Sequence, residues 1–119
     1  MKISAKTLTN RTRTVLASII FSDEDGLKQT ENLRIVYKAM SIAAARELEA
    51  IQKEIADETD RVIFQLTHLI QSLPDVVDES GDPVKVTKEF LESLDVQHLK
   101  VISESIAADL NPNNLPSVN

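Results

Sequence analysis

The chain has 119 residues, a formal net charge of −6 and no cysteine. Its length suits one domain with its own apolar core, and the lack of cysteine excludes disulfides and thiolate metal sites within it. Apolar residues make up 42% of the sequence but Phe, Tyr and Trp only 3%, which favours an aliphatic core and leaves little for stacking on nucleic-acid bases.

Charge is spread unevenly along the chain. The first twenty residues carry four basic side chains and no acidic one: Lys2, Lys6, Arg11 and Arg13. A basic segment ahead of an acidic body can bind nucleic acid or an acidic partner. The alternative, which we favour, is that it is a solvated N-terminus. The most apolar early stretch, residues 15–21, is too short to span a membrane and has no small-residue cleavage site after it. We therefore expect core there, and neither a signal peptide nor a membrane anchor.

Two helices are expected in the first third of the chain. Residues 7–21 carry Leu8, Val15, Leu16 and Ile19 at helical spacing, although four threonines lower the helix propensity. Residues 22–26 are acidic, end in glycine and predict a loop. Residues 27–40 contain neither Gly nor Pro and show an apolar i, i+3, i+4, i+7 stripe of Leu33, Val36, Tyr37 and Met40. That stripe predicts a second helix.

The middle of the chain has the strongest helical pattern. Ser41 is a candidate N-cap for a helix over residues 42–56, which is rich in good helix formers. Residues 57–60 interrupt the apolar pattern, either as a short loop or as an exposed turn of one longer helix. Residues 60–73 again place their apolar side chains on one side, and Pro74 is expected to end that helix.

The last third combines turn signals with two more helices. Short β-rich runs around Gly81 and Pro83 predict a β-hairpin over residues 75–87. Thr87 can cap a short helix over 88–94, and Asp95 can cap a final amphipathic helix over 96–110. The Asn- and Pro-rich residues 111–119 predict an irregular tail. The expected fold is thus mainly α, a single domain of about five helices over residues 1–110 with one short β-hairpin near residues 75–87.

Nothing in the sequence points to catalysis, a metal or a cofactor. The acidic run in residues 75–82 lacks the glycine and glutamate positions of an EF-hand loop. His68 and His98 are far apart on separate predicted helices, and neither stands in a zinc-binding spacing. With only two glycines, a phosphate-binding loop is excluded. We therefore expect a protein that acts by binding other proteins and not an enzyme.

Apolar faces are the remaining candidates for function. The face of the final helix at positions 99, 102 and 106 can be core, which we favour, or it can line a groove for a partner helix. A near-heptad seam through residues 48–73 can pack within the chain or between copies, so a homo-oligomer stays open. The candidate partner-binding residues are Val76, Val84, Leu99, Ile102 and Ile106.

Several short motifs follow one another in the C-terminal half. They are Leu-Ile-Gln-Ser-Leu at 69–73, Asp-Val-Val-Asp at 75–78, Glu-Ser-Gly-Asp-Pro-Val at 79–84, Val-Thr-Lys-Glu-Phe-Leu-Glu-Ser-Leu at 86–94, an amphipathic helix at 95–106 and Asn-Pro-Asn at 111–113. In this order, residues 62–113 resemble the tail assembly chaperones of long-tailed phages.

The resemblance implies a non-enzymatic role in tail morphogenesis. Such proteins bind the tape measure protein and the tail tube protein in the host cytoplasm, and they keep the long apolar tape measure soluble while tube subunits assemble around it. No catalytic, metal or cofactor residue is implied. Two alternatives remain: a structural component of the virion neck or tail, and a small nucleic-acid-binding regulator that uses the basic N-terminus.

Overall fold

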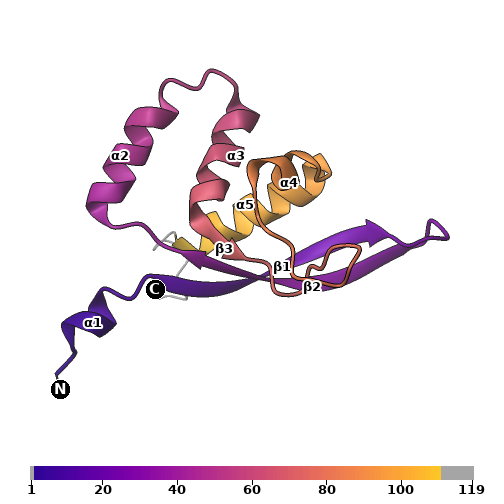
Figure 1. The fold of residues 1–119 in the computed structure, drawn as a ribbon, viewed down its shortest axis with the longest axis horizontal. Helices are drawn as coiled ribbons and strands as arrows, with labels where there is room; N and C mark the ends of the chain where they lie inside the picture. The colour runs from indigo at the N-terminus through magenta and orange to yellow at the C-terminus, as the bar shows by residue number, and fades with distance from the viewer. Residues whose placement is uncertain (1, 111–119) are drawn as a thin grey trace, which may run out of the picture.

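A computed structural model describes residues 2–110 and shows an α+β fold, with a three-stranded antiparallel sheet and the helices of residues 42–110 on one side of it (Figure 1). The prediction of a mainly α domain is therefore wrong. The elements in chain order are α1 (Ala5–Leu8), β1 (Thr12–Ser22), β2 (Lys28–Lys38), α2 (Ile42–Gln52), α3 (Glu58–Leu69), β3 (Ile70–Ser72), α4 (Lys88–Glu92) and α5 (Val96–Leu110).

The predicted helix over residues 7–21 is instead a four-residue helix, α1, followed by the long strand β1. Ser4 caps α1, and its side-chain oxygen accepts a hydrogen bond from the Thr7 N–H. In β1 the side chains that face the helices alternate: Val15, Ala17 and Ile19 are buried or half-buried, whereas their neighbours Leu16 and Ile20 are 60% exposed. This period of two, together with many β-branched residues, outweighs the accidental helical spacing.

The predicted helix over residues 27–40 is the strand β2, which pairs with β1 along its whole length. Leu33, Ile35 and Tyr37 alternate toward the helical side, and Ile35 and Tyr37 are fully buried. The loop expected at residues 22–26 is present, and it joins two strands of a hairpin. Gly26 adopts φ +80° there, a backbone conformation that is strained for residues with a side chain.

The helical layer matches the sequence more closely. Ser41 caps α2, Asp57 caps α3 and Thr87 caps α4, each by accepting a backbone N–H three residues later. Because α2 ends at Gln52 and α3 begins at Glu58, residues 57–60 do not continue one long helix. The final helix α5 has the predicted bounds, and it lies against β1.

Two predicted C-terminal elements differ in detail. Helix α3 ends at Leu69, because Ile70–Ser72 form the short strand β3 beside β2. The predicted hairpin over 75–87 is reduced to an isolated bridge between Val77 and Pro83, so no regular strands form there. Its turn does form: Asp78 accepts the N–H groups of Ser80 and Asp82, and Gly81 adopts φ +84°. The predicted tail, residues 111–119, lies outside the described part.

One aliphatic core lies between the sheet and the helices. The buried residues of this cluster come from every major element except α2: Ala17, Ile35, Tyr37, Ile63, Leu66, Leu69, Ile70, Leu73, Leu91, Leu99, Ile102 and Ile106. Helix α2 stands beside α3 at the periphery and buries one residue, Leu48. Side chains on the other face of the hairpin, such as Leu16 and Ile20, are 60% exposed, as is common for antiparallel sheets.

Candidate partner-binding groove

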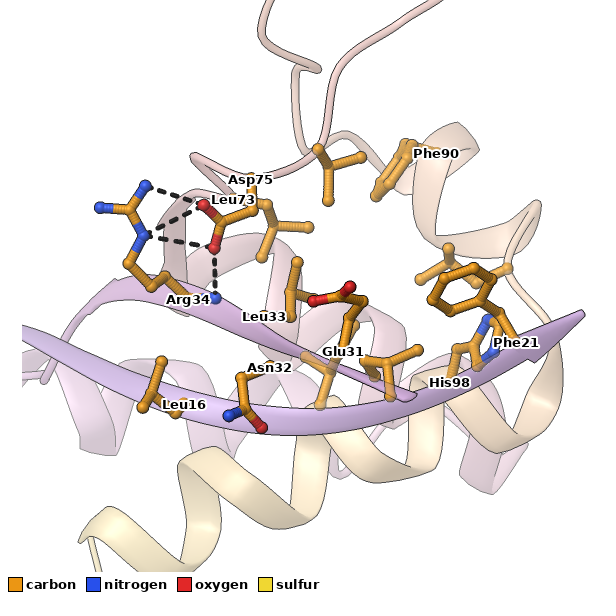
Figure 2. Close-up of a pocket in the computed structure, with 14 residues that line it drawn as sticks. Leu16, Phe21, Glu31, Asn32, Leu33, Arg34, Leu73, Asp75, Phe90 and His98 are labelled. Carbon is orange, nitrogen blue, oxygen red and sulfur yellow. Dashed lines mark hydrogen bonds and ion pairs between the residues drawn. The ribbon is translucent and has the colours of Figure 1, made fainter. Parts of the chain in front are cut away.

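An open groove of about 790 Å³ lies where the outer half of the hairpin meets the C-terminal segment. Figure 2 shows the side chains that surround it: Leu16, Ile19, Phe21, Glu31, Asn32, Leu33, Arg34, Leu73, Asp75, Val76, Phe90, Leu94, His98 and Ile102. Most are apolar, and two of the three phenylalanines of the chain are among them. This composition, an apolar lining with a few polar groups, is typical of a binding site.

The hairpin and the C-terminal segment supply different sides of the groove. Ile19, Phe21 and Leu33 belong to β1 and β2, whereas Val76 belongs to the loop after β3 and Phe90 to α4. Phe21 is 37% exposed, and the other four are half-buried. An apolar partner could therefore cover these side chains without rearrangement of the core.

Arg34 and Asp75 close one end of the groove (Figure 2). The Asp75 carboxylate accepts a hydrogen bond from the Arg34 backbone N–H at 2.8 Å, and Arg34 Nη2 lies 2.8 Å from Asp75 Oδ1. The guanidinium of Arg34, followed by its backbone N–H, holds the pKa of Asp75 below its ordinary value. A single side chain thus fixes the loop after β3 to strand β2.

His98 fastens the hairpin to α5 from the other strand. Its Nε2 lies 2.9 Å from the Ile20 carbonyl oxygen, so the hydrogen bond requires a proton on Nε2. The His98 side chain is half-buried at the groove. His68, by contrast, is exposed, and its Nδ1 lies 2.9 Å from the Phe64 carbonyl oxygen.

Strand β2 has an unpaired edge along the groove. Strand β3 pairs with β2 only opposite Val36 and Tyr37, so no described strand pairs with residues 28–34 on that side. Hydrogen-bonded and non-hydrogen-bonded pairs alternate in an antiparallel ladder. Because the Arg34 N–H points to Asp75, the N–H and C=O groups of Asn32 and Thr30, two and four residues away, also point away from β1.

The five predicted partner-binding residues fall into separate places. Val76 and Ile102 both line the groove, but Ile102 is only 2% exposed and belongs to the core. Leu99 and Ile106 are also core residues, with 8% and 2% exposure, so little of either side chain is available to a partner. Val84 is half-buried and lies outside the groove lining.

Sequence reasoning missed the hairpin's contribution to the groove. Phe21, Glu31 and Leu33 were assigned to two predicted helices, 7–21 and 27–40, so they could not be placed on one surface with Phe90. The weak signals available were the β-branched and aromatic residues of 12–21 and the alternation of Leu33, Ile35 and Tyr37. The Arg34–Asp75 contact joins residues 41 positions apart and leaves no local signal.

No family model, curated protein or solved structure matched this chain in the comparisons made. Within residues 2–110, no three His, Asp or Glu side chains are grouped so that they could hold a metal ion. None of the helices in that range is long and apolar enough to cross a membrane.

Asp75→Asn should weaken the fold most at neutral pH and least in acid. A carboxyl group whose folded pKa is depressed contributes stability above its unfolded pKa, and this stability is lost as the pH falls through the folded value. The difference in melting temperature between wild type and Asp75→Asn should therefore shrink below about pH 4. Thermal melts followed by circular dichroism across this range test it. Glu79→Gln, which changes a neighbouring exposed carboxylate, serves as control, and an equal pH dependence in both variants would contradict the assignment.

Proposed function

We propose that the protein is a tail assembly chaperone of a long-tailed phage, which binds the tape measure protein and the tail tube protein in the host cytoplasm. The observation that carries the proposal is the open apolar groove beside the unpaired edge of β2. A chaperone of this kind must cover apolar segments of a long partner and need not catalyse any reaction. A groove with an apolar lining on a small acidic domain is suited to that task.

The position of the C-terminal motifs is a second observation that supports the proposal. Leu73, Asp75, Val76 and Phe90, which belong to the motif series that resembles the chaperone family, line one side of the groove. Helices α4 (Lys88–Glu92) and α5 (Val96–Leu110) overlap the same series. The motifs therefore coincide with the surface that we assign to the partner.

Co-expression with the tape measure protein encoded in the same phage genome tests the proposal. We expect the tape measure protein to become soluble and to co-purify with the chain. Val76→Asp should lose this effect, because it places a charge in the groove, whereas Val96→Asp should keep it, because Val96 is 75% exposed on α5 outside the groove. Equal melting temperatures of the two variants show that both are folded.

Two outcomes would count against the proposal. If the tape measure protein stays insoluble with wild-type chain and no complex forms, the chaperone function is wrong. If mass spectrometry finds the chain as a stoichiometric component of purified particles, the protein is a structural part of the neck or tail.

A further inference from the structure

The unpaired edge of β2 and the apolar groove lie together and face the same space. Figure 2 shows Glu31 and Leu33 of β2 directed into the groove, opposite Phe90 of α4. The backbone groups of Asn32 and Thr30 point away from β1, as the alternation of the ladder requires. A partner at this position would therefore meet backbone donors and acceptors along one side and apolar side chains along the other.

Asp75 indicates what kind of group belongs at this edge. Its Oδ2 accepts the Arg34 N–H at 2.8 Å, at the position where the carbonyl of a neighbouring strand would stand. The same edge is used by the Ser72 residue of β3 opposite Val36. The backbone groups at the edge of β2 therefore have partners near Val36, where β3 pairs, and at Arg34, where the Asp75 carboxylate accepts the N–H. No described segment of the chain pairs with this edge over residues 28–33.

The charge of Glu31 indicates which kind of side chain a partner would carry at this position. Glu31 is exposed, its carboxylate is directed into the groove, and no ion pair to it forms within residues 2–110. The other acidic side chain of the lining, Asp75, is already paired with Arg34. Opposite charges on directly facing residues of neighbouring strands stabilise their pairing. A Lys or Arg in the partner, facing Glu31, would neutralise the one unpaired charge of the groove.

We propose that the groove binds an extended peptide segment of a partner protein, which adds to the edge of β2 as a further strand beside residues 28–33. The segment carries apolar side chains at every second position, and these enter the groove between Leu33 and Phe90. A basic side chain of the segment faces Glu31. Main-chain hydrogen bonds to β2 supply affinity, and the groove, which receives every second side chain of the segment, supplies specificity. The inference deepens the proposed function, because it describes how that partner is held, but its test requires no phage protein.

Two synthetic peptides of about ten residues with the same composition provide the probe. In the first, Val and Leu occupy alternate positions and one Lys is central; in the second, the same residues are placed at the i, i+3, i+4 spacing of a helix. We expect the alternating peptide to bind and to slow hydrogen exchange at the Asn32 and Thr30 amides, as read by nuclear magnetic resonance. The amide of Ser18, which lies directly opposite Asn32 on the outer edge of β1, should not change.

A matched pair of proline substitutions distinguishes an effect on the edge of β2 from a general effect on the stability of the hairpin. Asn32→Pro removes an N–H that points away from β1, and Ser18→Pro removes the equivalent N–H on the other edge of the hairpin. We expect Asn32→Pro to weaken peptide binding about tenfold or more, and Ser18→Pro to leave the affinity unchanged. Glu31→Lys keeps both edges intact and should reverse the preference between peptides with a central Lys and a central Glu.

Several results would overturn the inference. Tighter binding of the helically spaced peptide would make the groove a helix site, and equal effects of the two proline variants would exclude the β2 edge. If sedimentation shows a dimer of wild-type chain that Asn32→Pro dissociates, the occupant is a second copy of β2. A soluble tape measure complex that tolerates Asn32→Pro and Glu31→Lys would leave the chaperone function standing and reject this mode of binding.

Discussion

Truncation of Ile102 to alanine is expected to lower the free energy of unfolding by about 2–5 kcal/mol, the usual range for a buried isoleucine. Ile102 is 2% exposed, and it stands on the face of α5 that packs into the core beneath the groove. Its removal leaves a cavity that the surrounding strands cannot easily fill, because the hairpin is already fixed at Arg34 and Ile20. Urea unfolding followed by far-ultraviolet circular dichroism measures the change.

The control for this prediction is on the same helix. Val96→Ala removes apolar atoms from a side chain that is 75% exposed and should change the free energy of unfolding by no more than about 0.5 kcal/mol. If the two variants are equally stable, α5 does not pack as described. For this reason Ile102 variants are unsuitable for the binding test: a loss of partner binding in them would report unfolding and not a lost contact with the partner.

Tyr37 is expected to ionise at about pH 12 instead of near pH 10. Burial raises the pKa of Tyr37, and the hydrogen bond that its hydroxyl donates to Asp109, together with repulsion from that carboxylate, raises the pKa further to about 12. Arg13 opposes the shift only weakly. Because the chain contains one tyrosine and no tryptophan, the near-ultraviolet absorbance of the phenolate reports this residue alone.

The shift in the pKa of Tyr37 has a consequence for alkaline stability. A raised folded pKa means that the neutral phenol is favoured by folding, so its contribution is complete below the unfolded pKa near 10 and is lost as the pH rises toward 12. The loss should be at most about 2–3 kcal/mol, because solvent around the exposed Asp109 carboxylate screens part of the interaction. Tyr37→Phe removes this alkaline component, and urea-unfolded protein should titrate near pH 10. A folded-state midpoint near pH 10 would contradict the buried hydrogen bond.

The sequence predicted the helical half of the fold better than the sheet, for a physical reason. Caps are local: Ser41 and Thr87 each accept an N–H three residues along the chain, so both were visible as patterns. Strand pairing is not local. Residues 27–40 fit a helical stripe as well as an alternation, and only pairing with β1 decides between them. The same pairing creates the edge of β2, so the most distinctive side of the candidate site could not be predicted.

The C-terminal side of the site was partly predictable. Val76 was named as a partner-binding residue and lines the groove, whereas Leu99, Ile102 and Ile106 were correctly seen as one apolar face. An amphipathic pattern shows which side of a helix is apolar but not what covers it. Here strand β1, which was expected to be a helix, covers that face.

The contact between α5 and β1 has a consequence for the order of events during synthesis. The hydrogen bond from His98 to Ile20 joins residues 78 positions apart, whereas β1 and β2 are connected by a short loop. The hairpin can therefore pair early on the ribosome, but its inner apolar face is not fully covered until residues 96–110 have been made. Such late closure slows folding and leaves a nascent chain open to aggregation. Synthesis of α5 thus completes the cover over β1 within residues 2–110.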